Sequence, residues 1–141
     1  MGSTLHSLIP SRFLIILAHL ILCLSLLLSE RSQLIETSLP KRFSAVEAKY
    51  TSDLCIVAFS LSVIFVLFEL VGFLSGATMF MVSYNLVSII FHFSGVISTS
   101  FFIVETWNLQ SYWYIFVGTI CIPLLLETTN VISKIWCKHS L

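Results

Sequence analysis

The chain has 141 residues, of which 57% are hydrophobic and only 10% are charged, and its mean hydropathy is +1.01. Soluble globular domains carry about 25% charged residues, so this composition excludes an ordinary soluble fold. Seven basic and seven acidic residues give a formal net charge of zero, so nothing in the composition favours nucleic-acid binding. We expect one domain, residues 1–141, that lies mostly within a membrane.

Four stretches of the chain are apolar enough to cross a bilayer, which takes about 20 mostly apolar residues per helix. The uncharged run 70–104 is too long for one span, so it must contain a helix end, a turn and the start of a second helix. The sequence therefore predicts an all-α membrane protein whose four transmembrane helices form an antiparallel bundle. The predicted spans are 13–29, 54–74, 80–104 and 112–132, and a polar loop covers 30–53.

The first span, 13–29, follows a short N-terminal segment with Arg12 at the predicted membrane edge. Its apolar run is longer than the roughly 7–15 residues of a signal peptide. Ser29-Glu30-Arg31 also fails to match a small-x-small cleavage site. We interpret this span as a retained membrane anchor.

The loop 30–53 mixes acidic and basic side chains and is the only sizeable segment expected in water. Pro40 marks a turn, and Ser44 and Glu47 have the spacing of a capping box that begins a helix leading into the second span. Four spans place both termini on one side of the membrane. The seven basic residues divide three to four between the two sides, so the positive-inside rule leaves the orientation open.

The second span has one face of mainly small and polar residues, which recur at alternating steps of four and three along positions 58, 62, 65, 69, 72 and 76. Small residues let another helix approach closely in lipid, so this face is predicted to pack against a neighbour. The alternative for the two glycines is that they only end the helix and form the turn that follows. The predicted packing residues are Ser62, Glu69, Gly72 and Gly76.

The third span repeats the pattern at steps of three and four. Because two adjacent helices each carry a small or polar face, we expect these faces to pack together or toward the centre of the bundle. The predicted packing residues of this span are Asn85, Ser88, His92, Gly95 and Thr99.

Two acidic residues, Glu69 and Glu127, fall inside predicted spans, and no basic residue lies in mid-span to balance them. An ionised carboxylate there is costly, by roughly 2.5–3.5 kcal/mol for Asp at a helix centre, so such residues are paired, protonated or functional. We expect Glu127 and Glu69 to hold the bundle in register through interhelical hydrogen bonds. The alternative is a small proton-coupled transporter or channel subunit that uses both acidic residues.

Helix rise places four polar side chains at one depth, on the side of the termini: His19, Glu69, Asn85 and Glu127.

The fourth span, 112–132, begins with aromatic residues and contains a proline. Tyr112, Trp113 and Tyr114 have amphipathic rings that suit the headgroup level of a bilayer. Pro123 lacks a backbone donor and leaves the carbonyl of Thr119 without its helical partner, so a local kink is expected.

No motif of a catalytic or cofactor-binding site is present: His-Glu-x-x-His, Cys-x-x-Cys, Gly-x-Ser-x-Gly and a glycine-rich phosphate loop are all absent. The cysteines have no paired spacing that would indicate a disulfide framework or a zinc site. We therefore expect no enzymatic activity, no cofactor and no metal. Cys137, just beyond the last span, is open to lipid modification.

Several segments keep an order and spacing that point to one family. They are Pro10-Ser11-Arg12-Phe13-Leu14, Leu17-Ala18-His19-Leu20, Glu69-Leu70-Val71-Gly72-Phe73-Leu74-Ser75-Gly76, Ser100-Phe101-Phe102-Ile103 with Trp107, and Tyr112-Trp113-Tyr114-Ile115-Phe116-Val117. In these segments the chain resembles the transmembrane protein 107 family, whose members are tetraspan membrane proteins. The resemblance runs from about Pro10 to the end of the fourth span.

The resemblance implies a component of the ciliary transition zone, within the Meckel-syndrome-type complex at the base of the cilium, with both termini in the cytoplasm. It implies partners among the membrane and peripheral proteins of that zone, including tectonic-type proteins. It also implies roles in ciliogenesis, in gating the composition of the ciliary membrane and in Hedgehog signalling.

Overall fold

The computed structural model describes residues 2–29, 31–39, 41–76 and 78–139. All regular elements in these ranges are helical: α1 (Gly2–Ser29), α2 (Arg31–Ser38), α3 (Ala45–Leu74), α4 (Val82–Val104), α5 (Leu109–Phe116), the π-helical turn η1 (Val117–Cys121) and α6 (Ile122–His139). Four segments are long and apolar enough to cross a membrane: His6–Leu28, Ala45–Leu74, Val82–Val104 and Leu109–Cys137. The predicted all-α fold with four long packed helices is confirmed.

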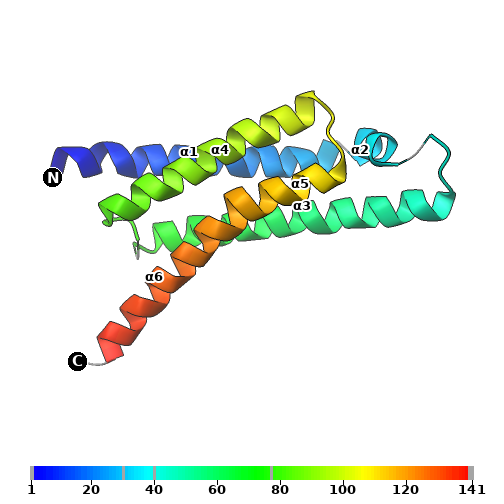
Figure 1. The fold of residues 1–141 in the computed structure, drawn as a ribbon. Helices are drawn as coiled ribbons and strands as arrows, with labels where there is room; N and C mark the ends of the chain where they lie inside the picture. The colour runs from blue at the N-terminus through cyan, green and yellow to red at the C-terminus, as the bar shows by residue number, and fades with distance from the viewer. Residues whose placement is uncertain (1, 30, 40, 77, 140–141) are drawn as a thin grey trace.

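The long helices alternate in direction, so both ends of the chain lie at the same end of the bundle (Figure 1). Helix α1 occupies the centre because it packs against both α3 and α4. Helices α5 and α6, joined through η1, form the fourth span, and α6 diverges from the other helices toward the C-terminus (Figure 1). The small and polar faces of α3 and α4 therefore meet α1 at the bundle centre. The backbones of α3 and α4 are not adjacent in the described structure, and the two faces meet only through side chains at the centre, where Glu69 contacts His92.

Helix α1 begins at Gly2, well before the predicted start of the first span, and Pro10 and Arg12 both lie inside it. The prediction that Arg12 sits at the membrane edge is wrong, since Arg12 lies inside the candidate span His6–Leu28, and its side chain is fully buried within the bundle. The expectation that no basic side chain balances the buried acids is wrong for the same reason. The charge of Arg12 suggested a span boundary, but the helix continues through it.

Local chemistry sets the ends of α3. The predicted capping box is confirmed: Ser44 Oγ accepts from the backbone N–H of Glu47 at 3.2 Å, and the N–H of Ser44 donates to Glu47 Oε2 at 2.7 Å. At the other end, Gly76 has φ +78°, a left-handed conformation that glycine adopts without the steric penalty of a Cβ. The turn between α3 and α4 therefore depends on the backbone freedom of Gly76.

The irregularity expected near Pro123 takes the form of a wider helical turn. The backbone N–H of Ile122 donates to the carbonyl of Val117, which closes the π-helical turn η1 immediately before the proline. The Tyr84 hydroxyl of α4 donates to the carbonyl of Pro123 at 3.3 Å. A side chain of α4 thus donates to the backbone in the first turn of α6, directly after the irregular segment.

An apolar core fills the half of the bundle nearer the α1–α3 loop. The ring of Tyr112 packs edge-on against Phe59, with centroids 4.8 Å apart, and its hydroxyl lies 2.7 Å from Ser62 Oγ. Large apolar side chains also cover much of the outside of the helices, among them Leu14, Ile64, Phe68, Ile90, Phe93 and Leu125. Such an exterior suits lipid, and the polar groups are left to the interior.

Candidate functional site

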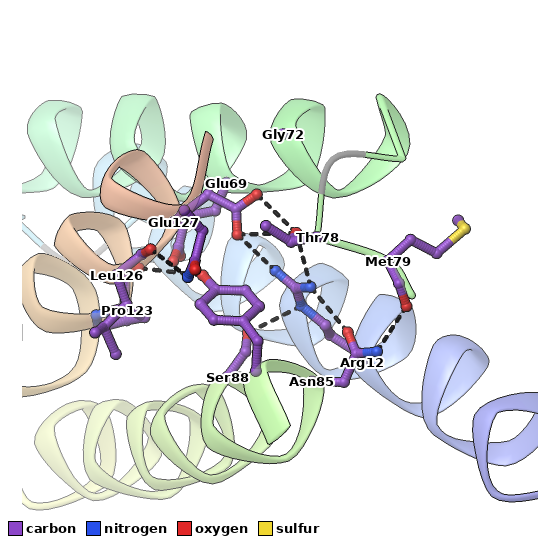
Figure 2. Close-up of polar contacts among 12 residues, drawn as sticks. Arg12, Glu69, Gly72, Thr78, Met79, Asn85, Ser88, Pro123, Leu126 and Glu127 are labelled. Carbon is purple, nitrogen blue, oxygen red and sulfur yellow. Dashed lines mark hydrogen bonds and ion pairs between the residues drawn. The ribbon is translucent and has the colours of Figure 1, made fainter. Parts of the chain in front are cut away.

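A buried arginine is the centre of the polar interior. Arg12 Nη2 donates to Glu127 Oε2 at 2.9 Å, and neither side chain has any exposed surface. Arg12 Nη1 donates to Asn85 Oδ1 at 2.9 Å and to Thr78 Oγ1 at 3.1 Å. Arg12 Nε donates to Ser88 Oγ at 3.1 Å. Figure 2 shows these side chains converging on the guanidinium from α4, α6 and the α3–α4 turn.

Glu127 and Asn85 are in turn held by further hydrogen bonds. The Thr78 hydroxyl donates to Glu127 Oε1 at 2.8 Å, and Asn85 Nδ2 donates to the carbonyl of Met79 at 2.7 Å (Figure 2). The Asn85 amide therefore links the guanidinium to the backbone of the α3–α4 turn. The bond from Thr78 to the Glu127 carboxylate is charge-assisted, and such bonds are roughly twice as strong as neutral ones.

Two aromatic rings flank the guanidinium. Its central carbon lies 4.8 Å from the centroid of Phe73 and 4.6 Å from that of Tyr84. At these distances the ring faces attract the cation, and the attraction is larger where water is excluded. The charge of Arg12 is thus compensated by one carboxylate, several oxygen acceptors and two aromatic faces.

Gly72 leaves room for the Glu127 carboxylate. A Cβ at position 72 would lie 2.7 Å from Glu127 Oε1, closer than real contacts allow. Gly76 has no such role: a Cβ there would meet nothing within 4 Å. Of the two glycines predicted to pack, only Gly72 contacts a neighbouring helix, and Gly76 acts through its backbone conformation.

A second polar cluster joins three helices. His19 Nδ1 of α1 lies 3.0 Å from His92 Nδ1 of α4, and His92 Nε2 lies 2.9 Å from Glu69 Oε2 of α3. All three side chains are fully buried. Gly95 provides the space for His19, since a Cβ at position 95 would lie 2.5 Å from His19 Cε1.

The sequence prediction placed four polar side chains in a single layer, and the structure divides them between the two clusters. Asn85 and Glu127 surround Arg12, whereas His19 and Glu69 lie on either side of His92. The remaining predicted residues are also buried: Ser88 contacts Arg12, Ser62 contacts Tyr112, and Thr99 lies on the inner face of α4. All of the predicted polar residues of α3 and α4 therefore face inward.

The sequence prediction missed Arg12 as a site residue, along with Thr78 and Tyr84. A signal for Arg12 was present, because the inner face of α1 follows the same alternating steps of four and three as the inner faces of α3 and α4. Its buried members are Arg12, Ile16, His19, Cys23 and Leu26. Thr78 belongs to a turn, so no helical periodicity could have revealed it.

These two clusters combine ion pairs, hydrogen bonds and titratable side chains. Within the ranges that the structure describes, no three His, Cys, Asp or Glu side chains are grouped so as to hold a metal ion. The strongest acid and base of the first cluster, Glu127 and Arg12, are already paired with each other. Chemically, the arrangement can fix helix positions and can hold or exchange protons.

A lateral groove of about 310 Å³ lies between α3 and α6, in the region where the two helices diverge. Its walls are almost entirely apolar, and small residues of α3 form part of it. The lining residues are Phe68, Val71, Gly72, Ser75, Glu127, Thr128, Val131 and Ile132. The groove opens sideways from the bundle, where lipid or another membrane protein would meet it.

Comparison with known proteins gives the family. The family model described as TMEM107, transmembrane protein, matches residues 8–131. "Transmembrane protein 107" of Rattus norvegicus is 38% identical over 76 residues, which cover 54% of this chain and 54% of that protein. The protein of the same name from Danio rerio is 37% identical over 78 residues, 55% of this chain and 57% of that protein.

The chain thus spans about half the length of the curated relatives it matches. No solved structure matches it. The family model, by contrast, extends from the first turns of α1 into α6 and includes both polar clusters. The chain therefore belongs to the TMEM107 family of transmembrane proteins.

Proposed function

We propose that the protein is a non-enzymatic scaffold in the membrane of the ciliary transition zone, as part of a Meckel-syndrome-type complex. It acts through lateral contacts of its helices with other membrane proteins, tectonic-type proteins among them. In this role it supports ciliogenesis, the gating of ciliary membrane composition and, through these, Hedgehog signalling. Membership in the TMEM107 family supports the proposal.

The observation that carries the scaffold mechanism is the ion pair between Arg12 and Glu127. Both side chains are fully buried, and their polar atoms bond to other side chains of the bundle. A charge pair used in this way fixes the positions of α1 and α6 and is not available to a substrate. Breaking such a pair leaves an uncompensated buried charge, so the pair favours one arrangement of the helices.

The lateral groove between α3 and α6 supports the proposed mode of contact. Helices associate in lipid through close packing at small residues, and Gly72 and Ser75 lie in the groove wall. A partner helix in this groove would bury apolar surface of both α3 and α6. The contact would therefore depend on the arrangement that the Arg12–Glu127 pair maintains.

Localisation in a ciliated cell tests the proposal. Ile132 lines the groove and is 56% exposed, so Ile132→Trp fills the groove without entering the core. Ile90 of α4 is 64% exposed on a surface outside the groove, so Ile90→Trp is the matched control. The tagged wild-type protein and the Ile90→Trp variant are expected at the cilium base and in complexes with tectonic-type proteins. The Ile132→Trp variant is expected to insert into membranes but to lose its localisation at the cilium base and its complexes with tectonic-type proteins.

Two results would contradict the proposal. Wild-type protein spread through the cell membrane, with none concentrated at the cilium base, would refute the location. Normal localisation and partner recovery for a well-inserted Ile132→Trp variant would refute the groove as the contact surface.

A small proton-coupled transporter or channel subunit is the second candidate. The observation that favours it is the row of titratable groups from His19 through His92 to Glu69. Liposomes that contain the purified protein and a pH-sensitive dye distinguish the two functions. The scaffold function predicts no proton flux above that of empty liposomes, whereas flux that disappears in Glu69→Gln and Glu127→Gln variants would favour transport.

A further inference from the structure

The cluster of His19, His92 and Glu69 has a feature that the scaffold function does not use. Its three titratable side chains come from α1, α4 and α3, are fully buried and form a continuous row of contacts. The central imidazole of His92 contacts the other two groups through both of its ring nitrogens. Each contact restricts where protons can lie.

The contact between the two imidazoles requires one proton. A distance of 3.0 Å between His19 Nδ1 and His92 Nδ1 is that of a hydrogen bond, in which one nitrogen donates and the other accepts. If both Nδ1 atoms carried a proton, or if neither did, the two atoms would repel each other. One of the two histidines must therefore be protonated at Nδ1.

The contact between His92 and Glu69 has the distance of an ion pair. Nε2 and Oε2 are 2.9 Å apart, yet in the described structure neither atom meets the angular requirement for a hydrogen bond. Charge attraction depends less on direction than hydrogen bonding does. The geometry therefore fits an imidazolium beside a carboxylate better than it fits two neutral groups.

The charges around the cluster favour one bound proton. The titratable and charged groups that face it from α1, α4 and α6 are Arg12, Tyr84 and Glu127. Because Arg12 and Glu127 neutralise each other, an ionised Glu69 beside two neutral histidines would be a lone charge in the membrane interior. Such a charge is costly in lipid, and one bound proton removes it.

We propose that this cluster is a proton-binding site in which His92 is an imidazolium paired with the Glu69 carboxylate and His19 is the neutral acceptor. His92 then donates from Nδ1 to His19 Nδ1, which places the remaining proton of His19 on Nε2. The bound proton acts as a structural ligand that joins α1, α3 and α4. This inference goes beyond the scaffold function, which requires only that the bundle be fixed.

The proposed assignment leaves one proton on the buried Nε2 of His19. In the part of the chain that the structure describes, this atom has no hydrogen-bond partner. Without the bound proton, both histidines would be neutral and Glu69 would be an unpaired anion. Loss of the proton is therefore expressed as a charge at Glu69.

Nitrogen NMR of the imidazoles tests the protonation states directly. The full chain is labelled with ¹⁵N-histidine and reconstituted into lipid nanodiscs at neutral pH. We expect one buried histidine with both ring nitrogens protonated and one neutral histidine protonated at Nε2. In the Glu69→Gln variant the doubly protonated signal should be lost, whereas Glu36→Gln, at an exposed position of α2, should keep it. Two neutral buried histidines in the wild-type protein would overturn the proposal, even if the Glu69→Gln variant fails to fold.

The pH dependence of stability gives an independent measurement with a defined sign. The folded protein holds one proton that the unfolded chain releases above about pH 7, so stability falls as the pH rises. Uptake of one proton on folding corresponds to a roughly tenfold loss in the folding equilibrium constant per pH unit in that range. The slope should disappear in Glu69→Gln and persist in Glu36→Gln. A wild-type protein whose stability is constant or rises through this range would contradict the bound proton.

Discussion

Arg12 of α1 and Glu127 of α6 are separated by 115 positions in the chain, yet Arg12 Nη2 lies 2.9 Å from Glu127 Oε2 with both side chains fully buried. This pair connects the first and last helices of the bundle. Asn85 and Ser88 of α4 and Thr78 of the α3–α4 turn bond to the same guanidinium. Arg12 thus connects its own helix, α1, with side chains of α4, of α6 and of the turn between α3 and α4.

Replacement of Gly72 tests how closely α3 approaches Glu127. Gly72→Ala adds a Cβ 2.7 Å from Glu127 Oε1, so the carboxylate must move away from Arg12 and Thr78. Overpacking of this kind costs about 1–3 kcal/mol. We expect this loss in the free energy of unfolding, measured by denaturant titration in bicelles.

Gly118 provides the control for this substitution. A Cβ there would meet nothing within 4 Å, and its backbone does not require glycine. Gly118→Ala should therefore leave stability unchanged or raise it slightly, because alanine has the better helix propensity. Equal losses for the Gly72 and Gly118 variants would show that the contact with Glu127 is unimportant.

Substitutions at Gly76 should depend on backbone conformation rather than on size. The φ of +78° is left-handed, a region in which most side chains cost about 1–2 kcal/mol and asparagine is tolerated better. Gly76→Val should be clearly destabilising and Gly76→Asn only weakly so, in the same unfolding measurement. If both variants lose the same stability, the account of this turn is wrong.

The sequence predicted the fold because lipid leaves few alternatives. A backbone that crosses the membrane must satisfy its own hydrogen bonds, so uncharged runs such as 70–104 are confined to helices and the turn between them. The inner faces of α3 and α4 were also predictable, since small and polar residues recur there at helical spacing. That both faces pack against α1 could not be read from either helix alone.

The polar site was only partly predictable, and Arg12 shows why. A charge next to an apolar run usually marks the end of a span, because a long basic side chain can reach the headgroups. In this protein the helix continues through Arg12 and the side chain turns inward to Glu127. The partner of Arg12 lies in another span, and no pattern within α1 could identify that partner.

Removal of the Tyr112 hydroxyl measures the polar contact at the other end of the bundle. The hydroxyl lies 2.7 Å from Ser62 Oγ, while the ring packs on Phe59. Tyr112→Phe keeps the ring and should lose about 0.6 kcal/mol of stability, and at most about 1.7 kcal/mol. Tyr114, which is 74% exposed, provides the matched control, and Tyr114→Phe should have no effect in the same assay. A Tyr112→Phe variant as stable as the control would show that this hydrogen bond contributes nothing.

The measurement that tests the central claim most directly is a double-mutant cycle on Arg12 and Glu127, read as the free energy of unfolding in bicelles. If the buried charges hold the bundle together, Arg12→Gln and Glu127→Gln should each lose about 3–5 kcal/mol, because each leaves one charge buried and unpaired. The double variant should then be more stable than the sum of the two losses allows, by well over the roughly 0.5 kcal/mol expected of independent sites. Additive losses, or single variants as stable as the wild-type protein, would contradict the claim.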